Sequence, residues 1–210
     1  MRDDGTVPRP PQGSSPVAQI LLLHSVYGLR PAVRTAADRL RAAGHTVHTP
    51  DLFEGRTFDD VEEGMAFKEE VGSDELLRRA VGEAAPLLAS GATLVYAGLS
   101  LGGALAQNLA LADENARGLL LLHGTSDIRE DAATAIPVQL HVAEPDPFES
   151  EDWLNAWYLG MRKAGADVEV HRYRGAGHLF TDPELPDYDA EAAEQTWAVA
   201  LDFLAELDAA

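Results

Sequence analysis

Residues 94–103 read Leu94-Val95-Tyr96-Ala97-Gly98-Leu99-Ser100-Leu101-Gly102-Gly103, an apolar run that leads into the pattern G-x-S-x-G. A strand that ends here and a helix that starts at once would force the chain to turn within one or two residues. Such a turn holds the serine in a strained conformation and exposes it at the carboxyl edge of a sheet. Glycines are needed two positions before and after the serine, because side chains there would collide with the turn. The stretch therefore predicts a strand–turn–helix unit that presents Ser100 as a nucleophile.

Strand and helix patterns alternate along the rest of the chain. Apolar runs of strand length lie at residues 18–24, 46–50, 93–98, 118–123, 138–143 and 168–173. Helical patterns lie between and after them, at residues 31–43, 60–71, 74–89, 101–112, 151–164 and 191–207. This alternation predicts an α/β fold, with a mostly parallel six-stranded sheet and helices on both of its faces.

The composition of the strands predicts their order in the sheet. The runs at residues 20–23, 94–97 and 119–122 are almost continuously apolar, as expected of strands that are covered on both faces. Residues 168–173 alternate between apolar and polar side chains, and residues 46–49 are short and half polar. These two segments are expected at the edges. With right-handed crossovers, the order 2-1-3-4-5-6 satisfies both conditions and places the Ser100 strand centrally.

Length and composition predict one folded domain. The chain has 210 residues, of which 46% are hydrophobic and 24% charged, as in ordinary globular proteins. Residues 1–17 are rich in proline, glycine and serine and are expected to form a flexible N-terminal tail, so that the domain spans residues 18–210. The apolar run at residues 20–23 is too short for a signal segment or a membrane span, which favours a cytoplasmic protein.

Charge and residue usage exclude several partners and chemistries. The net charge of −19 repels nucleic acid and anionic membranes. The absence of cysteine excludes disulfides, thiolate metal sites and a cysteine nucleophile. The sequence has no H-E-x-x-H motif, no close cluster of histidine and aspartate and no phosphate-binding loop, so no metal and no cofactor are predicted. We expect a small-molecule substrate and a monomer or homodimer.

A serine nucleophile needs a base, and the base needs an orienting acid. In parallel-sheet enzymes with such a serine turn, the chain order is serine, acid, histidine, and each residue follows a strand. His178 follows the last strand in Gly175-Ala176-Gly177-His178, where the glycines permit the loop to fold over the serine. Asp146 follows the fifth strand and is the predicted acid. Asp127, after the fourth strand, and Glu144 remain alternative acids.

The other histidines fit the role of base less well. Three of them are expected to be solvated because they lie on edge strands or after a helix end, namely His45, His48 and His171. His24 and His123 end strands at the carboxyl edge of the sheet, where they could line the pocket. Neither follows an acid in the required order, so His178 is preferred.

Ester cleavage also needs N–H donors for the oxyanion that develops on the carbonyl oxygen. The residue after the nucleophile, Leu101, supplies one backbone N–H at the positive end of its helix. The second donor is expected in the loop after the first strand, from Val26, with Ser25 as the near alternative. Residues expected to line the substrate pocket are Ser25, Tyr27, Phe67, Phe148 and Phe180.

Together these segments resemble the dienelactone hydrolase family of the α/β-hydrolase superfamily, from residue 18 to residue 207. The resemblance rests on the loop at residues 24–29, the serine turn at residues 98–103, Thr49-Pro50-Asp51-Leu52-Phe53, Asp146-Pro147-Phe148, Gly177-His178-Leu179-Phe180 and Pro186-Asp187-Tyr188. It implies an α/β-hydrolase fold and the hydrolysis of an ester or lactone.

Some residues depart from the pattern of that family. Dienelactone hydrolases use a cysteine nucleophile and place a glutamate in the loop after the first strand, where this chain has Ser100 and Ser25. Lactone-cleaving members also carry an arginine shortly after the catalytic histidine, which holds the substrate carboxylate. Asp182 lies in that stretch here, and an acid would repel a carboxylate. The resemblance therefore implies a serine-nucleophile variant that acts on a neutral substrate.

The leading hypothesis is a serine hydrolase that cleaves small neutral carboxylic esters or lactones through an acyl-enzyme. Only residues 124–137 connect the fourth and fifth strands, so no large lid is expected, and at most residues 53–72 cover the site. A thioesterase or an acyltransferase would use the same three residues. A catalytically silent α/β-hydrolase fold that serves as a binding protein is a further alternative, disfavoured by the intact set of Ser100, Asp146 and His178.

Overall fold

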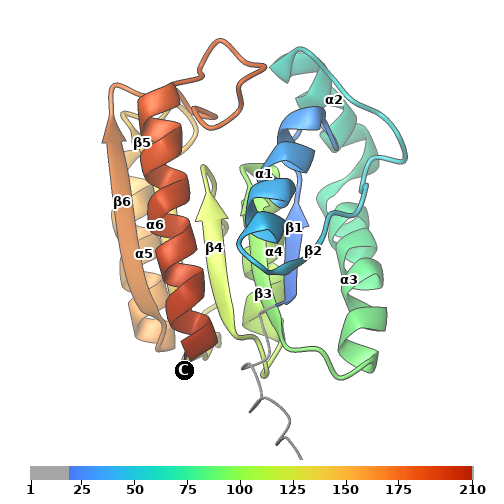
Figure 1. Cartoon of the computed structure of the whole chain (residues 1–210), viewed down its shortest axis with the longest axis vertical. Coiled ribbons are helices and arrows are strands. Elements are labelled where there is room, and N and C mark those ends of the chain that lie inside the picture. The colour runs from blue at the N-terminus through green and yellow to red at the C-terminus, as the bar shows by residue number, and fades with distance from the viewer. Residues whose placement is uncertain (1–18, 210) are drawn as a thin grey trace, which may run out of the picture.

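A computed structural model describes residues 19–209, and the predicted tail at residues 1–17 lies outside them. Six strands form one sheet in which every neighbouring pair is parallel, in the order β2-β1-β3-β4-β5-β6 (Figure 1). This result confirms the strand order and the two edge strands predicted from composition. The strands are β1 (Gln19–Leu23), β2 (Thr46–His48), β3 (Leu94–Leu99), β4 (Gly118–Leu122), β5 (Pro137–Glu144) and β6 (Asp167–Arg174).

Helices cover both faces of the sheet, as predicted. α1 and α6 lie on one face, and α3, α4 and α5 lie on the other (Figure 1). Within residues 19–209, no helix combines the length and the apolar character that a bilayer span requires. The helices are α1 (Pro31–Ala42), α2 (Val61–Val71), α3 (Ser73–Ala89), α4 (Leu101–Ala112), α5 (Glu151–Ala164) and α6 (Ala190–Ala209).

Each face of the sheet has its own apolar core. Successive side chains of a strand point to opposite faces, so Leu21 and Leu23 pack on the side of α3, α4 and α5, whereas Ile20 and Leu22 pack on the side of α1 and α6. All four are buried. A strand between two cores needs an apolar side chain at every position, which is why β1 reads as a continuous apolar run.

Two local signals place α2 beside the carboxyl ends of the strands (Figure 1). The side chain of Asp60 accepts the backbone N–H of Glu63 and caps the start of α2. Gly72 has a φ of 85°, a conformation that favours glycine, and α3 starts at the next residue. The chain therefore changes direction sharply between α2 and α3. α2 belongs to the segment that the sequence predicted as the only cover of the site.

One prediction about the histidines is wrong. The sequence predicts a solvated His45, but this side chain is buried. α6 continues to Ala209, beyond its predicted end at residue 207, and brings a carboxylate oxygen of Asp208 within 3.5 Å of Nδ1 of His45. The two additional residues of α6 therefore bring the helix end against the loop between α1 and β2.

Burial also governs the titration of three other histidines and predicts acid sensitivity. Burial lowers the pKa of His24 and His123, and it lowers the pKa of His141 to about 3. Because these folded-state values lie below the unfolded value of about 6.5, the unfolded chain binds more protons in mild acid. We therefore expect the free energy of unfolding to fall as the pH decreases below about 6.5, by up to about 1.4 kcal/mol per pH unit for each histidine.

Guanidinium unfolding between about pH 8 and pH 5 measures this dependence. The variant His141→Gln keeps a polar side chain near Gln139 and Tyr173, which contact His141. Below about pH 6.5, its free energy of unfolding should depend less steeply on pH, by up to about 1.4 kcal/mol per pH unit. A wild-type free energy of unfolding that stays constant over this range would contradict the buried, neutral state of the three histidines.

Candidate active site

Ser100 lies in the turn between β3 and α4. Its φ of 50° and ψ of −112° fall outside the regions that residues with a side chain favour. Its backbone N–H donates to the carbonyl oxygen of Leu122 at 2.7 Å, which anchors the turn to β4. A Cβ at Gly98 would overlap the backbone of Gly102, and one at Gly102 would overlap the backbone of Leu23. Both glycines are therefore needed for α4 to approach the sheet so closely.

A chain of hydrogen bonds begins at Ser100 and passes through His178 to Asp146. Oγ of Ser100 lies 2.9 Å from Nε2 of His178, and Nδ1 of His178 lies 2.9 and 2.8 Å from the two carboxylate oxygens of Asp146. Because an ionised carboxylate only accepts, Nδ1 donates to Asp146 and leaves Nε2 to accept the Ser100 hydroxyl proton. The structure thus brings the three predicted residues together, in the arrangement that activates a serine.

The loop that carries Asp146 also holds its carboxylate in place. Oδ1 of Asp146 accepts the backbone N–H of Phe148 at 2.9 Å and that of Glu149 at 3.2 Å. The two alternative acids lie elsewhere. Asp127 is exposed, and Glu144 forms ion pairs with arginines of β6, among them a 2.8 Å contact with Nε of Arg174. Asp146 is therefore the acid that contacts the histidine.

A buried histidine supports the loop that carries His178. His123 is completely buried, and its Nε2 lies 2.7 Å from Oγ1 of Thr181. Its ring meets that of Phe180 edge-on, with 4.5 Å between the ring centroids. These contacts tie residues 177–182 to the end of β4. The sequence suggested that His123 and His24 could line the pocket, but both are buried outside its lining.

A buried carboxyl group next to Asp146 was not identified from the sequence. Glu149 is 7% exposed and accepts hydrogen bonds from the N–H of Thr125 at 2.9 Å and from its hydroxyl at 2.7 Å. Nε1 of Trp153 donates to the same hydroxyl. Burial raises the pKa of Glu149. These contacts join the Asp146 loop to the loop that follows β4.

A cavity of about 790 Å³ opens in front of Ser100. It is bounded by the loop after β1, by α2 and the start of α3, by the first two turns of α4, and by the loops that carry Asp146 and His178. Tyr27 and Phe148, two of the predicted pocket residues, line it. The expected oxyanion donors Val26 and Leu101 line it as well.

Three residues predicted for the pocket do not line it. Ser25 is buried, and its Oγ accepts the N–H of Tyr27. Phe67 lies on α2 but packs against Phe53, with 5.0 Å between the ring centroids. Phe180 is fully buried and packs against His123, within the loop that carries His178. A large aromatic side chain gains more free energy from burial in the core than from a position on a solvated wall.

Among the charged side chains at the cavity, acids outnumber bases. Asp74, Glu149 and Asp187 border it, whereas Lys68 is the one basic residue among the lining side chains, apart from His178. Asp182, the acid that the sequence placed near the substrate, is buried outside the lining, and burial raises its pKa. Within the described part of the chain, no group of three or more histidines and acids is placed to hold a metal ion.

The sequence model of the dienelactone hydrolase family matches residues 4–207 of this chain. The chain belongs to the dienelactone hydrolase family. It is thus a hydrolase of a family that acts on ester bonds. The nucleophile predicted from the sequence is a serine, Ser100. The resemblance stated from the sequence motifs is confirmed.

Individual relatives of this dienelactone hydrolase family member are distant in sequence. A protein from Aquifex aeolicus, provisionally named a carboxymethylenebutenolidase, is 25% identical over 200 residues, which cover 88% of this chain and 86% of that protein. A dienelactone hydrolase-like promiscuous phosphotriesterase from metagenomic libraries has a TM-score of 0.79 at 23% identity, over 93% of this chain and 88% of its own. Esterase PE8 has a TM-score of 0.69 at 17% identity, over 91% and 93% of the two chains. These structural similarities show that the fold is the α/β-hydrolase fold.

Proposed function

We propose that the protein is a serine hydrolase that cleaves neutral carboxylic esters or lactones of small to moderate size through an acyl-enzyme. The observation that carries this proposal is the unbroken chain of hydrogen bonds from Oγ of Ser100 through His178 to the carboxylate of Asp146. Membership of the dienelactone hydrolase family supports the ester bond as the target.

In the acylation step, Nε2 of His178 accepts the hydroxyl proton of Ser100 while Oγ attacks the carbonyl carbon of the substrate. The carbonyl oxygen becomes an oxyanion, which the backbone N–H groups of Val26 and Leu101 bind. The Leu101 N–H is the first of α4, where the helix dipole adds positive potential. The carboxylate of Asp146 stabilises the imidazolium that forms.

Collapse of the tetrahedral intermediate breaks the bond to the leaving oxygen, which takes the proton from Nε2 of His178. The acyl group stays on Oγ of Ser100. In the second half of the reaction, His178 removes a proton from a water molecule, and the resulting hydroxide attacks the acyl carbon. The acid is released, and Ser100 regains its proton from His178.

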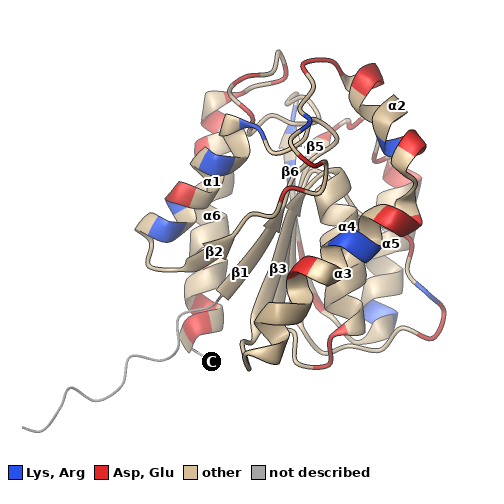
Figure 2. Cartoon of the chain, turned by 90° about the vertical axis from the view of Figure 1, so that its right-hand side faces the viewer, with Lys and Arg blue, Asp and Glu red and all other residues tan. Residues whose placement is uncertain are grey.

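The charges of the molecule support a neutral substrate. The net charge is −19, and acidic residues are spread over the helices and loops (Figure 2). Such a surface repels anions at long range. Lys68, at the cavity, lies 2.6 Å from the carboxylate of Glu69 and is therefore already partly neutralised. We expect a neutral ester to be hydrolysed faster than an analogue that carries a carboxylate.

A fluorophosphonate probe tests the proposed nucleophile directly, because it modifies activated serines covalently. Mass spectrometry should locate the label on Ser100 of the folded wild-type protein. The label should be lost in Ser100→Ala and kept in Ser90→Ala, whose hydroxyl bonds to the carbonyl oxygen of Leu87 at the end of α3. Folded protein that is not labelled at Ser100 would refute the proposal.

The contact between α2 and the loop after β1 predicts that a larger side chain on α2 would displace the oxyanion donor in that loop. A Cβ at Gly64 would lie 2.5 Å from the carbonyl oxygen of Val26. Gly64→Ala is therefore expected to displace either α2 or Val26. Since small displacements of catalytic groups are costly, we expect kcat/KM for p-nitrophenyl acetate to fall about 10- to 100-fold.

Gly82→Ala is the matched control for this variant. Gly82 also lies within a helix, α3, but a Cβ there would meet no atom within 4 Å. This substitution should leave kcat/KM unchanged and slightly stabilise α3. Equal kcat/KM values for the two variants would contradict a role of α2 in positioning Val26.

A further inference from the structure

The cavity extends away from Ser100 along α4. Four of its lining residues follow the i, i+3, i+4, i+7 spacing of one face of this helix, namely Leu101, Ala104, Leu105 and Asn108. The rise per residue of an α-helix places the first and last of them about 10 Å apart along the helix axis. The cavity therefore includes a groove that starts at the nucleophile and follows the first two turns of α4.

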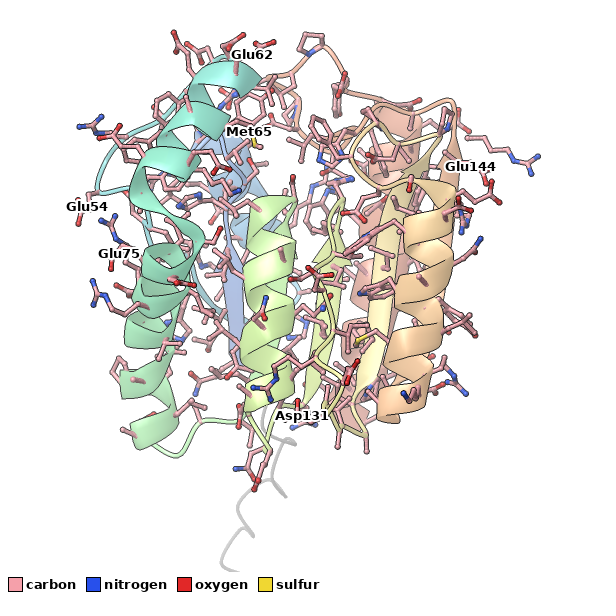
Figure 3. All side chains as sticks on the ribbon, turned by 180° about the vertical axis from the view of Figure 1, so that it is seen from behind. Glu54, Glu62, Met65, Glu75, Asp131 and Glu144 are labelled. Atoms are coloured by element: carbon pink, nitrogen blue, oxygen red, sulfur yellow. The ribbon has the colours of Figure 1, made fainter. Side chains whose placement is uncertain are left out.

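The opposite wall of this groove comes from α2 and α3. Val61 and Met65 of α2 and Leu77 of α3 line the cavity together with the α4 residues. The charged side chains of the same two helices that border the cavity are Lys68 and Asp74. Figure 3 shows Met65 reaching from α2 toward the N-terminal end of α4. Met65 is 36% exposed, so this wall presents an apolar side chain to solvent in the structure. Apolar surface of this kind is stabilised when an apolar ligand covers it.

The position of His178 assigns a direction to the substrate. Leu179 follows His178 in the chain and Asp187 packs against Gly177, so these cavity-lining residues lie on the His178 side. In the proposed mechanism, His178 delivers its proton to the leaving alcohol, so the alcohol has to lie on this side. The acyl chain is attached to the same carbonyl carbon and extends the other way, along α4.

We propose that the groove along α4 is an acyl-binding site for a linear, uncharged acyl chain of about eight carbons, an inference that rests on the proposed function. An extended chain advances about 3.5 Å for every three bonds, so a length of about 10 Å corresponds to about eight bonds. Complete burial of one methylene group is equivalent to about a fourfold gain in binding. Asn108 lies at the far end of the groove, so the carbons of a longer chain would leave the apolar walls.

A series of p-nitrophenyl esters from acetate to dodecanoate tests the groove in the wild-type protein. The value of kcat/KM, which reports acylation, should rise from acetate to octanoate by at least about 30-fold and then level off. A flat or falling series in a protein that hydrolyses the acetate would overturn the acyl groove and leave the proposed function intact. Absence of both ester hydrolysis and fluorophosphonate labelling would overturn the proposed function itself.

The variant Ala104→Leu fills the groove one turn beyond the nucleophile. It should lower the ratio of kcat/KM values for the octanoate and acetate esters at least about tenfold. Ala112→Leu introduces the same side chain at an exposed position of the same helix and should keep the wild-type ratio. If both variants behave alike, the groove along α4 does not bind the chain.

Esters with a long alcohol distinguish the two sides of the carbonyl group. The ratio of kcat/KM values for octyl acetate and ethyl acetate should be the same in the wild type and in Ala104→Leu, because the alcohol lies on the His178 side. A loss in this ratio as large as the loss for the octanoate ester would place the alcohol along α4 and overturn the assignment.

Discussion

Replacing Ser100 with alanine is expected to reduce kcat/KM for p-nitrophenyl acetate by about a million-fold, because no atom remains to accept the acyl group. The residual rate comes from the backbone donors, which still polarise the substrate carbonyl. Stability should change little, since alanine keeps the Cβ and loses only a hydroxyl that contacts Nε2 of His178. Thermal unfolding of both proteins checks that the loss is chemical.

A double variant tests whether the residues act as one unit. Once Ser100 is absent, the base has no hydroxyl to activate, so Ser100→Ala combined with His178→Ala should be no slower than Ser100→Ala alone. Losses that multiply in the double variant would contradict a single mechanism that uses both residues. A wild-type rate in Ser100→Ala would exclude the acyl-enzyme.

The strand order could be predicted because the sheet is covered at its centre and open at its edges. Residues 119–122 of β4 alternate between the two cores, so each of them is apolar whichever face it meets. In the edge strand β6, Asp167 and Glu169 are exposed and Val168 between them is buried, so the sequence alternates. Burial on one or two faces therefore leaves a local pattern that can be read without knowledge of the long-range contacts.

The positions of Ser100, Asp146 and His178 could be predicted from the sequence for a similar reason. Each follows a strand of a parallel sheet, and the carboxyl ends of such strands meet at one edge. The residues that line the pocket were harder to predict, because they depend on which face of α2 points to the cavity. The bend at Gly72 and the contact of Gly64 with Val26 direct Met65 to the cavity, whereas Phe67 packs in the core.

The supporting contacts could not be predicted because they join distant loops. Glu149 and Thr125 are 24 positions apart, and His123 and Thr181 are 58 apart. In a chain with 35 acidic residues, no local pattern marks Glu149 as one of the few that are buried. These polar side chains are buried only because partners from another loop satisfy their hydrogen bonds, and the partners are known only once the fold is assembled.

Asp146→Asn is expected to lower kcat by about ten thousand-fold, because it changes the tautomer of His178. The N–H groups of Phe148 and Glu149 donate to Oδ1 of Asp146, so the amide oxygen of asparagine takes that position and its NH₂ group faces His178. Nδ1 then has to accept a hydrogen bond, which leaves the ring proton on Nε2. In that state Nε2 is unable to accept the proton of the Ser100 hydroxyl.

Asp127→Asn is the matched control, because Asp127 also follows a strand but is exposed. Its kcat for p-nitrophenyl acetate should equal the wild-type value, and circular dichroism should show the same fold for both variants. Should Asp146→Asn keep wild-type kcat, the carboxylate would not orient the imidazole during the reaction. The hydrogen bonds from Ser100 to Asp146 would then describe only the resting geometry, and general-base catalysis by His178 would lose its support.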